Sequence, residues 1–411
     1  MTQEELANLD RQLTRKEIMK DAYERFKKPE GHLPMNKPEF YALCDSMSYE
    51  AKIHHAIDVA RKFYDTIVYD YGANVHVSVG GLDSITLLLF LRKYIDPDIK
   101  SVSASVLEYK SVQDVHKQIG IDVYLKPIKS KTEILREFGF PVISKEKAHK
   151  ISILQEPNAE KQTFIHAIMT GDMGEQGHYE HSDKIKLPDK WLRLFAGYYN
   201  DHRPDLDCKI APFKVSSDCC YWMKELPADL WAEENNSFPY LGLMASEHGQ
   251  REMGLIKNGC NYFGKSTVRS CPFARFSRQD LLQLALDLNV PVPTIYGTIE
   301  RKADGTLYTT RAQRTGCAMC GFGIHLEKRP HRFDRLREEN EKEWDFWMNR
   351  CVTDEETGEK YGWGRVLDYI GIEWRDKVDS NTWEQVNLLS EMQEDIWQGR
   401  KKQGSIIFRL T

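Results

Sequence analysis

Apolar residues change between helix-like and strand-like spacing along the middle of the chain. The spacing predicts a helix over Ala51 to Tyr69 and a short strand over Val75 to Val79, followed after a glycine turn by an apolar helix that begins near Ser84. Two more strands are predicted over Ser101 to Leu107 and Ile121 to Leu125, with a helical segment between them. Strands that alternate with helices form parallel sheets with helices on both faces. The predicted fold class is therefore α/β.

The segments around this alternation differ in character. Residues 1–50 are charged with helix-like apolar spacing, which predicts a helical N-terminal extension. Residues 149–212 are polar, rich in His and Lys and poorly periodic, which indicates an insertion or a covering loop. A strand over Tyr240 to Met244 and a helix over Ser277 to Leu288 are expected to continue the sheet domain, which thus spans residues 51–337. Residues 338–411 hold six of the nine tryptophans, which suits helices that pack on the core or on another copy of the chain.

Composition narrows the class of protein. The 411 residues are 41% hydrophobic and 29% charged, which is ordinary for a globular chain. The longest apolar run, Ile85 to Leu91, is far shorter than the roughly 20 residues that span a bilayer, and the N-terminus lacks the apolar core of a secretory signal. We therefore expect no membrane segment and a reducing cytoplasm, in which the nine cysteines stay reduced.

Charge leaves the partner open. The formal net charge of −5 carries no general nucleic-acid signature. Two stretches are locally basic, Lys126 to Lys150 and Arg329 to Arg337. These are either contacts for a nucleic acid or solvated helix faces.

The turn Gly80-Gly81-Leu82-Asp83-Ser84 connects the first predicted strand to the apolar helix. Backbone N–H groups converge at the N-terminus of a helix and bind phosphate oxygens there, and glycines let the backbone come close to such a ligand. Ser84 is expected to cap the helix, and Asp83 to orient the loop or to share a Mg²⁺ ion carried by a nucleotide. An ordinary strand-to-helix turn has the same residues, so the spacing alone leaves phosphate binding open.

Two arrangements stand out among the nine cysteines: the adjacent pair Cys219-Cys220 and the spaced pair Cys317-x-x-Cys320. Thiolates favour zinc or iron–sulfur clusters over hard cations. A CxxC turn presents two sulfurs to one centre, and a second pair can complete four ligands. Reduced cysteines buried in a core are the alternative.

These two motifs carry a resemblance. The glycine turn closely resembles the SGGxDS pyrophosphate loop of the N-type ATP pyrophosphatases and of the related phosphoadenosine-phosphosulfate (PAPS) reductases, although Val79 replaces the first serine and Ser78 stands one place earlier. The CC…CxxC order resembles the [4Fe–4S] ligand set of the adenosine-phosphosulfate (APS) reductase branch. Further segments resemble PAPS-reductase-like proteins: Leu107 to Tyr109, Ala211 to Lys214, Met223 to Pro227, Met244 to Glu247, Gly259 to Asn261, and Arg314 to Gly316.

The resemblance implies a Rossmann-like sheet of the adenine nucleotide alpha hydrolase type, with Asp83 as the catalytic residue. It implies phosphate or nucleotide contacts at Ser78, Gly80, Gly81, Leu82, Asp83, Ser84, Glu108, Glu247 and Arg251. It also implies a [4Fe–4S] cluster on Cys219, Cys220, Cys317 and Cys320, with Cys260 in reserve. A surface ion pair four residues apart is the alternative for Glu247 and Arg251.

One residue type is missing from the pattern. Sulfonucleotide reductases attack with a cysteine near the C-terminus, in a Glu-Cys-Gly-Leu/Ile-His segment. The last cysteine of this chain is Cys351, outside such a segment, and Phe322 precedes the partial match Gly323-Ile324-His325. Because covalent sulfite transfer needs an accessible thiolate, a simple reductase is disfavoured.

Three function classes therefore stay open. The first, implied by thiolating members of the superfamily, is an iron–sulfur enzyme that uses ATP and Mg²⁺ to adenylate an acceptor, DNA or tRNA, for sulfur transfer from a donor protein such as a cysteine desulfurase. The second is a PAPS or APS reductase that releases sulfite. The third is a non-catalytic nucleotide-binding regulatory protein with structural zinc. The sequence leaves the oligomeric state open, a homo-oligomer included.

Overall fold

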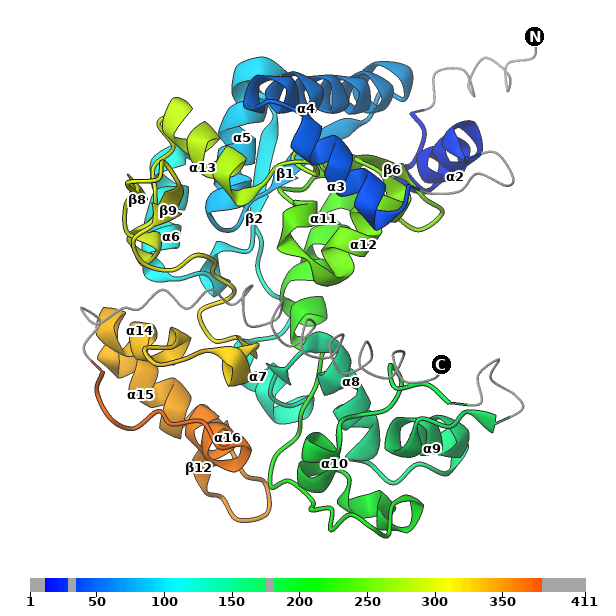
Figure 1. The fold of residues 1–411 in the computed structure, drawn as a ribbon, viewed down its shortest axis with the longest axis vertical. Helices are drawn as coiled ribbons and strands as arrows, with labels where there is room; N and C mark the ends of the chain where they lie inside the picture. Colours follow the sequence, from blue (N-terminus) through cyan, green and yellow to red (C-terminus); the bar gives the residue numbers. More distant parts are fainter. Residues whose placement is uncertain (1–11, 29–34, 175–180, 379–411) are drawn as a thin grey trace, which may run out of the picture. The chain divides into compact units, whose positions relative to one another are not determined.

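A computed structural model describes residues 12–28, 35–174 and 181–378, and the chain divides into two compact units (Figure 1). Unit 1 consists of Met1–Ile128 and Met223–Cys317, and unit 2 consists of Lys129–Trp222 and Ala318–Thr411. Each unit thus combines two separate stretches of sequence. This division differs from the expected one, in which a single domain covered residues 51–337.

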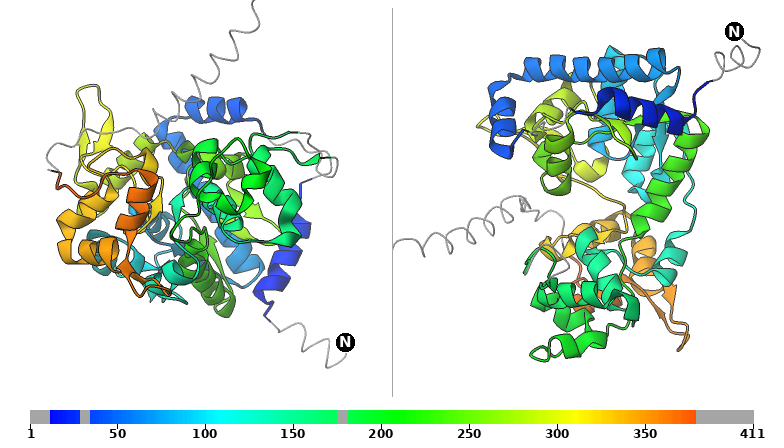
Figure 2. Two further views of the ribbon diagram at one scale, coloured as in Figure 1. Left: turned by 90° about the horizontal axis from the view of Figure 1, so that it is seen from below. Right: turned by 90° about the vertical axis from the view of Figure 1, so that its right-hand side faces the viewer.

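Unit 1 contains a six-stranded sheet in the order β3-β2-β1-β5-β7-β6. All neighbouring strands are parallel except β6 and β7. The fold class is therefore α/β, with a mostly parallel sheet flanked by helices, as predicted (Figure 2). The strands are β1 Asn74–Ser78, β2 Lys100–Ser103, β3 Val123–Tyr124, β5 Ser237–Tyr240, β6 Asn261–Phe263 and β7 Val268–Ser270, and a separate hairpin is formed by β8 Ile299–Arg301 and β9 Leu307–Thr309.

The helices of unit 1 follow the predicted pattern closely. Seven buried residues between Leu82 and Leu91 make α5 a core helix. A capping box formed by Ser277 and Asp280 starts α13 where the sequence predicts it. The helices are α2 Arg15–Phe26, α3 Lys37–Ser46, α4 Tyr49–Tyr64 with a π-helical continuation Asp65–Asp70, α5 Leu82–Tyr94, α6 Lys110–Ile119, α11 Leu226–Glu234, α12 Gly249–Asn258 and α13 Arg278–Asp287.

Two predicted strands end earlier than expected. The predicted strand Tyr240 to Met244 is wrong beyond its first residue, because β5 ends at Tyr240. Gly242 lies against the start of α5, where an added Cβ would be 3.1 Å from the carbonyl carbon of Asp83, so the apolar run leaves the sheet at that close approach. The strand predicted from Ser101 stops at Ser103 and continues as the 3₁₀ turn Ser105–Leu107.

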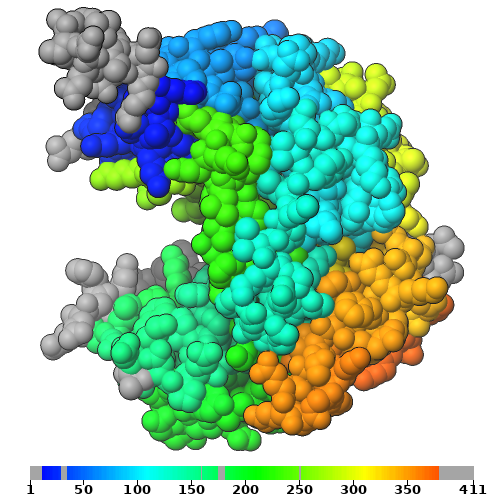
Figure 3. Space-filling model, turned by 180° about the vertical axis from the view of Figure 1, so that it is seen from behind, coloured from blue at the N-terminus to red at the C-terminus, as the bar shows by residue number. Residues whose placement is uncertain are grey.

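Unit 2 is built around an apolar core to which both of its sequence stretches contribute. Residues 149–174 and 181–212 supply helices and buried apolar side chains such as Trp191 and Phe195, so of the two expectations for residues 149–212, an insertion or a covering loop, the described part fits an insertion that forms part of this core. Figure 3 shows the two stretches of unit 2 side by side. The elements are α7 Lys131–Glu137, β4 Val142–Ile143, α8 Lys145–Leu154, α9 Gln162–Thr170, α10 Asp189–Phe195, β10 Gly321–Phe322, α14 Arg332–Glu339, α15 Glu341–Asn349, β11 Val352–Thr353, β12 Lys360–Tyr361 and α16 Trp363–Ile370.

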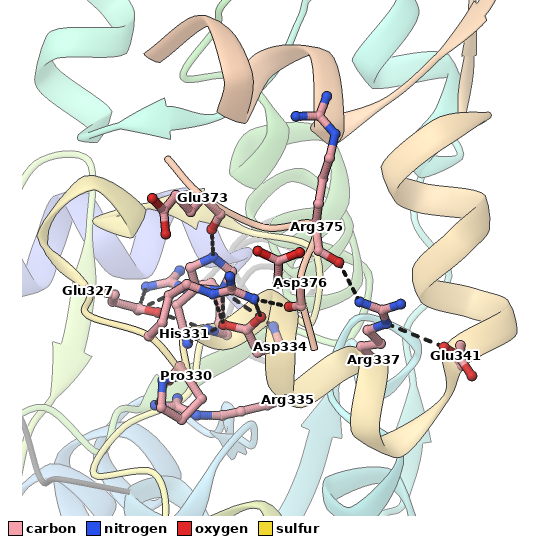
Figure 4. Close-up of polar contacts among 12 residues, drawn as sticks. Glu327, Pro330, His331, Asp334, Arg335, Arg337, Glu341, Glu373, Arg375 and Asp376 are labelled. Atoms are coloured by element: carbon pink, nitrogen blue, oxygen red, sulfur yellow. Dashed lines mark hydrogen bonds and ion pairs between the residues drawn. The ribbon is translucent and has the colours of Figure 1, made fainter. Parts of the chain in front are cut away.

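The last described segment of unit 2 is held by side chains of α14 and the residues before it (Figure 4). The His331 ring donates from Nε2 to the carbonyl of Glu373 at 2.9 Å, and Arg337 donates to the carbonyl of Arg375 at 2.8 Å. Trp344, Trp347, Trp363 and Trp374 are buried in the same core, whereas Trp383 and Trp397 lie outside the described residues. The described part of this tryptophan-rich region thus packs on the core of its own unit.

In the part of the chain that the structure describes, no helix combines the length and the apolar character that crossing a membrane requires.

Candidate functional site

The glycine loop lies at the point of unit 1 where the order of the strands reverses. β1 pairs with β2 on one side and with β5 on the other, so the chain connections leave it in opposite directions. Open α/β sheets bind ligands outside the carboxyl ends of their strands at such a point. The close approach of Gly242 to Asp83 brings the end of β5 to the same place.

Ser84 connects the loop to the first turn of α5 by two hydrogen bonds. Its hydroxyl accepts the N–H of Gly80 at 2.7 Å and donates to the carbonyl of Gly81 at 3.0 Å. Gly81 occupies the N-cap position, so the expected capping role of Ser84 is wrong: Ser84 is the third residue of the helix and braces the loop from inside its first turn. The serine-cap prediction failed because the N-cap position lies three residues earlier, at Gly81.

Three backbone N–H groups at this helix start, those of Gly81, Asp83 and Ser84, donate to no acceptor in residues 12–28, 35–174 and 181–378. Such groups carry the partial positive charge of the helix N-terminus. The loop therefore offers the donors that a phosphate needs. Val79 stands where the resembled motif has its first serine. Its side chain is buried and its N–H donates to the carbonyl of Val102 within the sheet, so this position offers no donor to a phosphate. Ser78, one place earlier, is the last residue of β1.

Gly81 is required by a close approach. An added Cβ would lie 2.3 Å from the hydroxyl oxygen of Tyr296. That hydroxyl accepts the N–H of Leu82 at 3.2 Å and is hydrogen-bonded to the Thr315 hydroxyl at 2.6 Å. Burial raises the pKa of Tyr296 to about 12, so the phenol stays neutral.

A buried histidine orients the loop from the other side. His116 of α6 donates from Nε2 to the carbonyl of Gly80 at 2.7 Å, and its Nδ1 accepts from the Ser105 hydroxyl at 2.8 Å. Burial lowers the pKa of His116, which favours this neutral form. The Gly80 carbonyl is thereby bound within the protein.

The predicted catalytic residue, Asp83, is ion-paired. Arg278 donates to its Oδ1 at 2.6 Å and also to the carbonyl of Gln313 at 2.9 Å. The other carboxylate oxygen of Asp83 has no partner in the described part of the chain, so it fits a magnesium ion brought in by a nucleotide.

Glu108 is buried beside the loop, where its Oε1 would lie 3.5 Å from a Cβ added at Gly80. Lys224 pairs with this carboxylate at 2.8 Å and also hydrogen-bonds Cys317. Burial opposes the charge of Lys224, but its interactions with Cys317 and Glu108 outweigh that effect and hold the pKa of Lys224 well above its usual range. One lysine thus links the predicted nucleotide residue Glu108 to the predicted metal ligand Cys317.

Glu247 follows β5 and is bracketed by two guanidinium groups, those of Arg251 at 2.8 Å and Arg314 at 3.5 Å. The surface ion pair considered for Glu247 and Arg251 is present, but Glu247 is only 3% exposed. The charges of Asp83, Glu247 and Arg278 all act on Arg314. Three arginines therefore face two carboxylates here, which leaves one uncompensated positive charge that suits an anion.

The predicted cluster ligands are divided between the units. Cys317 is the last residue of unit 1, while Cys219, Cys220 and Cys320 belong to unit 2. Among the described residues, no group of three or more His, Cys, Asp or Glu is arranged to hold a metal ion. The [4Fe–4S] cluster on these cysteines remains a prediction.

Two other cysteines occupy apolar surroundings. Cys260, the reserve ligand, packs on a small cluster of unit 1 that includes Cys44 and Cys271, with its Sγ 3.8 Å from His55 Nε2. Burial raises the pKa of Cys260. Cys351 is buried in the core of unit 2 and donates to the carbonyl of Trp347, and burial raises its pKa to about 12. Neither thiol has the exposure and low pKa of a nucleophile.

The loop was found from sequence, but several residues that complete it were not. Arg278, His116 and Lys224 each reach the loop or its neighbours from a different element, and no local motif marked Arg278 or His116. The sole indication of Arg278 in the sequence is its position: it is a cation at the first residue of a helix, where the helix dipole disfavours positive charge.

No protein-family profile and no curated protein matches the chain. Among solved structures, the chain is similar to phosphoadenylyl-sulfate (PAPS) reductase from Candida auris, solved as a phosphate complex, with a TM-score of 0.31 and 10% sequence identity over 67% of this chain and 100% of that chain. At this TM-score the similarity carries no inference about the activity of the chain.

Proposed function

We propose that this protein is an ATP-pyrophosphatase-type enzyme: it binds MgATP at Gly80–Ser84 and adenylates an acceptor, a nucleic acid, for sulfur transfer. The observation that carries the proposal is the glycine loop itself. It presents three N–H groups that have no acceptor among the described residues, at the strand-order reversal of an α/β sheet, and an arginine-rich cluster adjoins it. Polyphosphates match such donors and charges.

The first step needs little from the protein beyond electrostatics. An oxygen of the acceptor attacks the α-phosphorus, a new O–P bond forms, and the bond from the α-phosphorus to the bridging oxygen breaks as pyrophosphate leaves. Backbone amides of the loop and nearby guanidinium groups stabilise the charge on that leaving group. Mg²⁺ arrives with the substrate and neutralises further charge. Sulfur at the sulfide level then displaces AMP from the acceptor.

The sulfur-transfer half and its [4Fe–4S] cluster are supported by the resemblance of the cysteine segments alone. The adenylation step does not depend on the cluster. Cys351 does not support the reductase alternative as its nucleophile, because that thiol is buried and donates a hydrogen bond to the carbonyl of Trp347.

Pyrophosphate release from ATP, measured with DNA, tRNA or neither, tests the proposal. Gly80→Ala is expected to lower the rate by about a hundredfold, because a methyl group on the loop keeps the phosphates from approaching the free N–H groups, and the loss of one such charge-stabilising contact has about this magnitude. Its added Cβ meets nothing closer than 3.5 Å, so the fold should tolerate it. Gly254→Ala is the matched control, because its Cβ would meet only Arg269 at 3.7 Å. Release of sulfite from PAPS or APS with no pyrophosphate from ATP would instead establish the reductase, and nucleotide binding with neither product would favour a regulatory protein.

A further inference from the structure

The pair of Asp83 and Arg278 presents a conflict within the proposed site. Asp83 is the residue expected to meet Mg²⁺, yet one of its oxygens is occupied by a guanidinium at 2.6 Å. Both side chains are about a fifth exposed, so solvent screens the pair only partly. A nucleotide that arrives with its metal must share or displace this contact.

Arg278 is also incompletely satisfied. Two of its nitrogens donate, to Asp83 and to the carbonyl of Gln313, but its Nε is buried and has no acceptor in the described residues. Buried N–H groups without acceptors are costly and uncommon. A guanidinium with an unused donor beside a helix N-terminus is equipped to take a phosphate oxygen, and arginine does so with fixed fork geometry.

The charges favour an exchange of partners. If Arg278 turns to a phosphate while Asp83 turns to Mg²⁺, every charge keeps an opposite neighbour. If nucleotide binds without metal, Asp83 is left facing both Arg278 and the polyphosphate, and the like charges repel. The metal therefore removes an obstacle to nucleotide binding as well as adding an attraction.

We propose that Arg278 is a nucleotide-phosphate ligand held on Asp83 until MgATP binds, so that Mg²⁺ and nucleotide bind cooperatively. This inference rests on the proposed function, because it takes the loop to be the nucleotide site. It assigns to Asp83 a second role, the electrostatic rejection of metal-free nucleotide.

Titration calorimetry with α,β-methylene-ATP, whose α–β bond is not cleaved, tests the exchange without any turnover. Each protein is titrated once with EDTA and once with MgCl₂. Asp83→Asn is expected to raise the affinity for the metal-free analogue about tenfold and to abolish the gain from Mg²⁺, a coupling in the usual range for linked sites. Arg278→Gln is expected to weaken the Mg²⁺ complex about a hundredfold. Arg278→Lys keeps the charge but not the fork, and is expected to fall between.

A second ion pair in unit 1 provides the matched control. Arg92 and Asp122 are 2.7 Å apart with similar exposure, 22% and 28%, away from the loop. Asp122→Asn is expected to change neither titration. Thermal unfolding of each variant shows whether the fold is kept, and in the double variant Asp83→Asn/Arg278→Gln the tenfold gain should vanish.

The outcomes separate the two proposals. If the unaltered protein binds the analogue neither with nor without Mg²⁺, the proposed function fails and this inference with it. If the unaltered protein binds but Asp83→Asn leaves or lowers the metal-free affinity, Arg278 is a structural brace, and the inference alone is overturned.

Discussion

The glycine loop and the cysteine segments were the two strongest motifs in the sequence, but only the residues around the loop come together within one unit of the structure. Around the loop, side chains from α5, α6 and α13, together with Tyr296, meet within unit 1, with hydrogen bonds of 2.6 to 3.2 Å. The four candidate cysteines instead divide between unit 1 and unit 2. Specific hydrogen bonds define the geometry of the loop, whereas the cluster is supported only by the sequence pattern of its cysteines.

This difference shows that a contiguous motif predicts local geometry better than a motif divided between remote segments. Gly80–Ser84 is contiguous, so a strand, a turn and a helix start are enough to shape it. A four-cysteine site must be closed by two remote segments, and its geometry depends on everything between them.

The largest expected effect concerns the cysteines. Protein purified without oxygen is expected to contain iron and acid-labile sulfide, and Cys317→Ser or Cys320→Ser is expected to lose both, because such clusters need thiolate ligands. Cys351→Ser is the control and should keep both iron and sulfide, since that thiol is buried in the core and hydrogen-bonded to the carbonyl of Trp347. Iron-free protein that binds zinc would replace the cluster with a structural metal.

The next effect is in the loop. Gly81→Ala is expected to abolish nucleotide binding and to lower the free energy of unfolding by about 3 kcal/mol, the upper range for overpacking, because its Cβ would sit 2.3 Å from the Tyr296 hydroxyl. Adding Tyr296→Phe removes that oxygen and should restore most of the stability, measured by urea denaturation. No recovery in the double variant would mean that the contact is not the cause.

A smaller effect is expected at Lys224. Lys224→Met leaves the buried carboxylate of Glu108 without its partner, which should cost about 2 kcal/mol, below the usual loss for a buried pair because Lys224 is 36% exposed. Glu108→Gln in the same chain should recover most of that loss. The exposed pair of Lys110 and Asp114 gives the comparison, where Lys110→Met should change the free energy of unfolding far less, because solvent screens the pair.

The smallest effect depends on pH. Burial in β1 lowers the pKa of His76 from 6.5 to about 3, so the folded chain resists the proton that the unfolded chain accepts. This contribution to stability is present above pH 6.5 and is lost as pH falls toward 3. His76→Gln should therefore flatten the decline measured between pH 7 and 5, by at most about 1.4 kcal/mol per pH unit.

Sequence reasoning anticipated the elements whose causes are local. The strand before the loop and the capped helix beginning at Arg278 lie where spacing and capping residues put them, and the apolar helix after the loop lies where its spacing puts it, although it begins at Leu82. It failed at Tyr240 to Met244, where the apolar run had the composition of a strand. The chain leaves the sheet there because Gly242 passes against α5, a contact between segments far apart in sequence.

The sequence by itself determined the phosphate loop and the α/β alternation, because strand, turn and helix propensities act between near neighbours. Only the tertiary structure decided that Arg278 holds Asp83, that His116 holds the Gly80 carbonyl, and that residues 149–174 and 181–212 build a core with residues 318–378. Those outcomes depend on which distant surfaces can bury apolar area and pair charge together, and no short stretch of the chain carries that information.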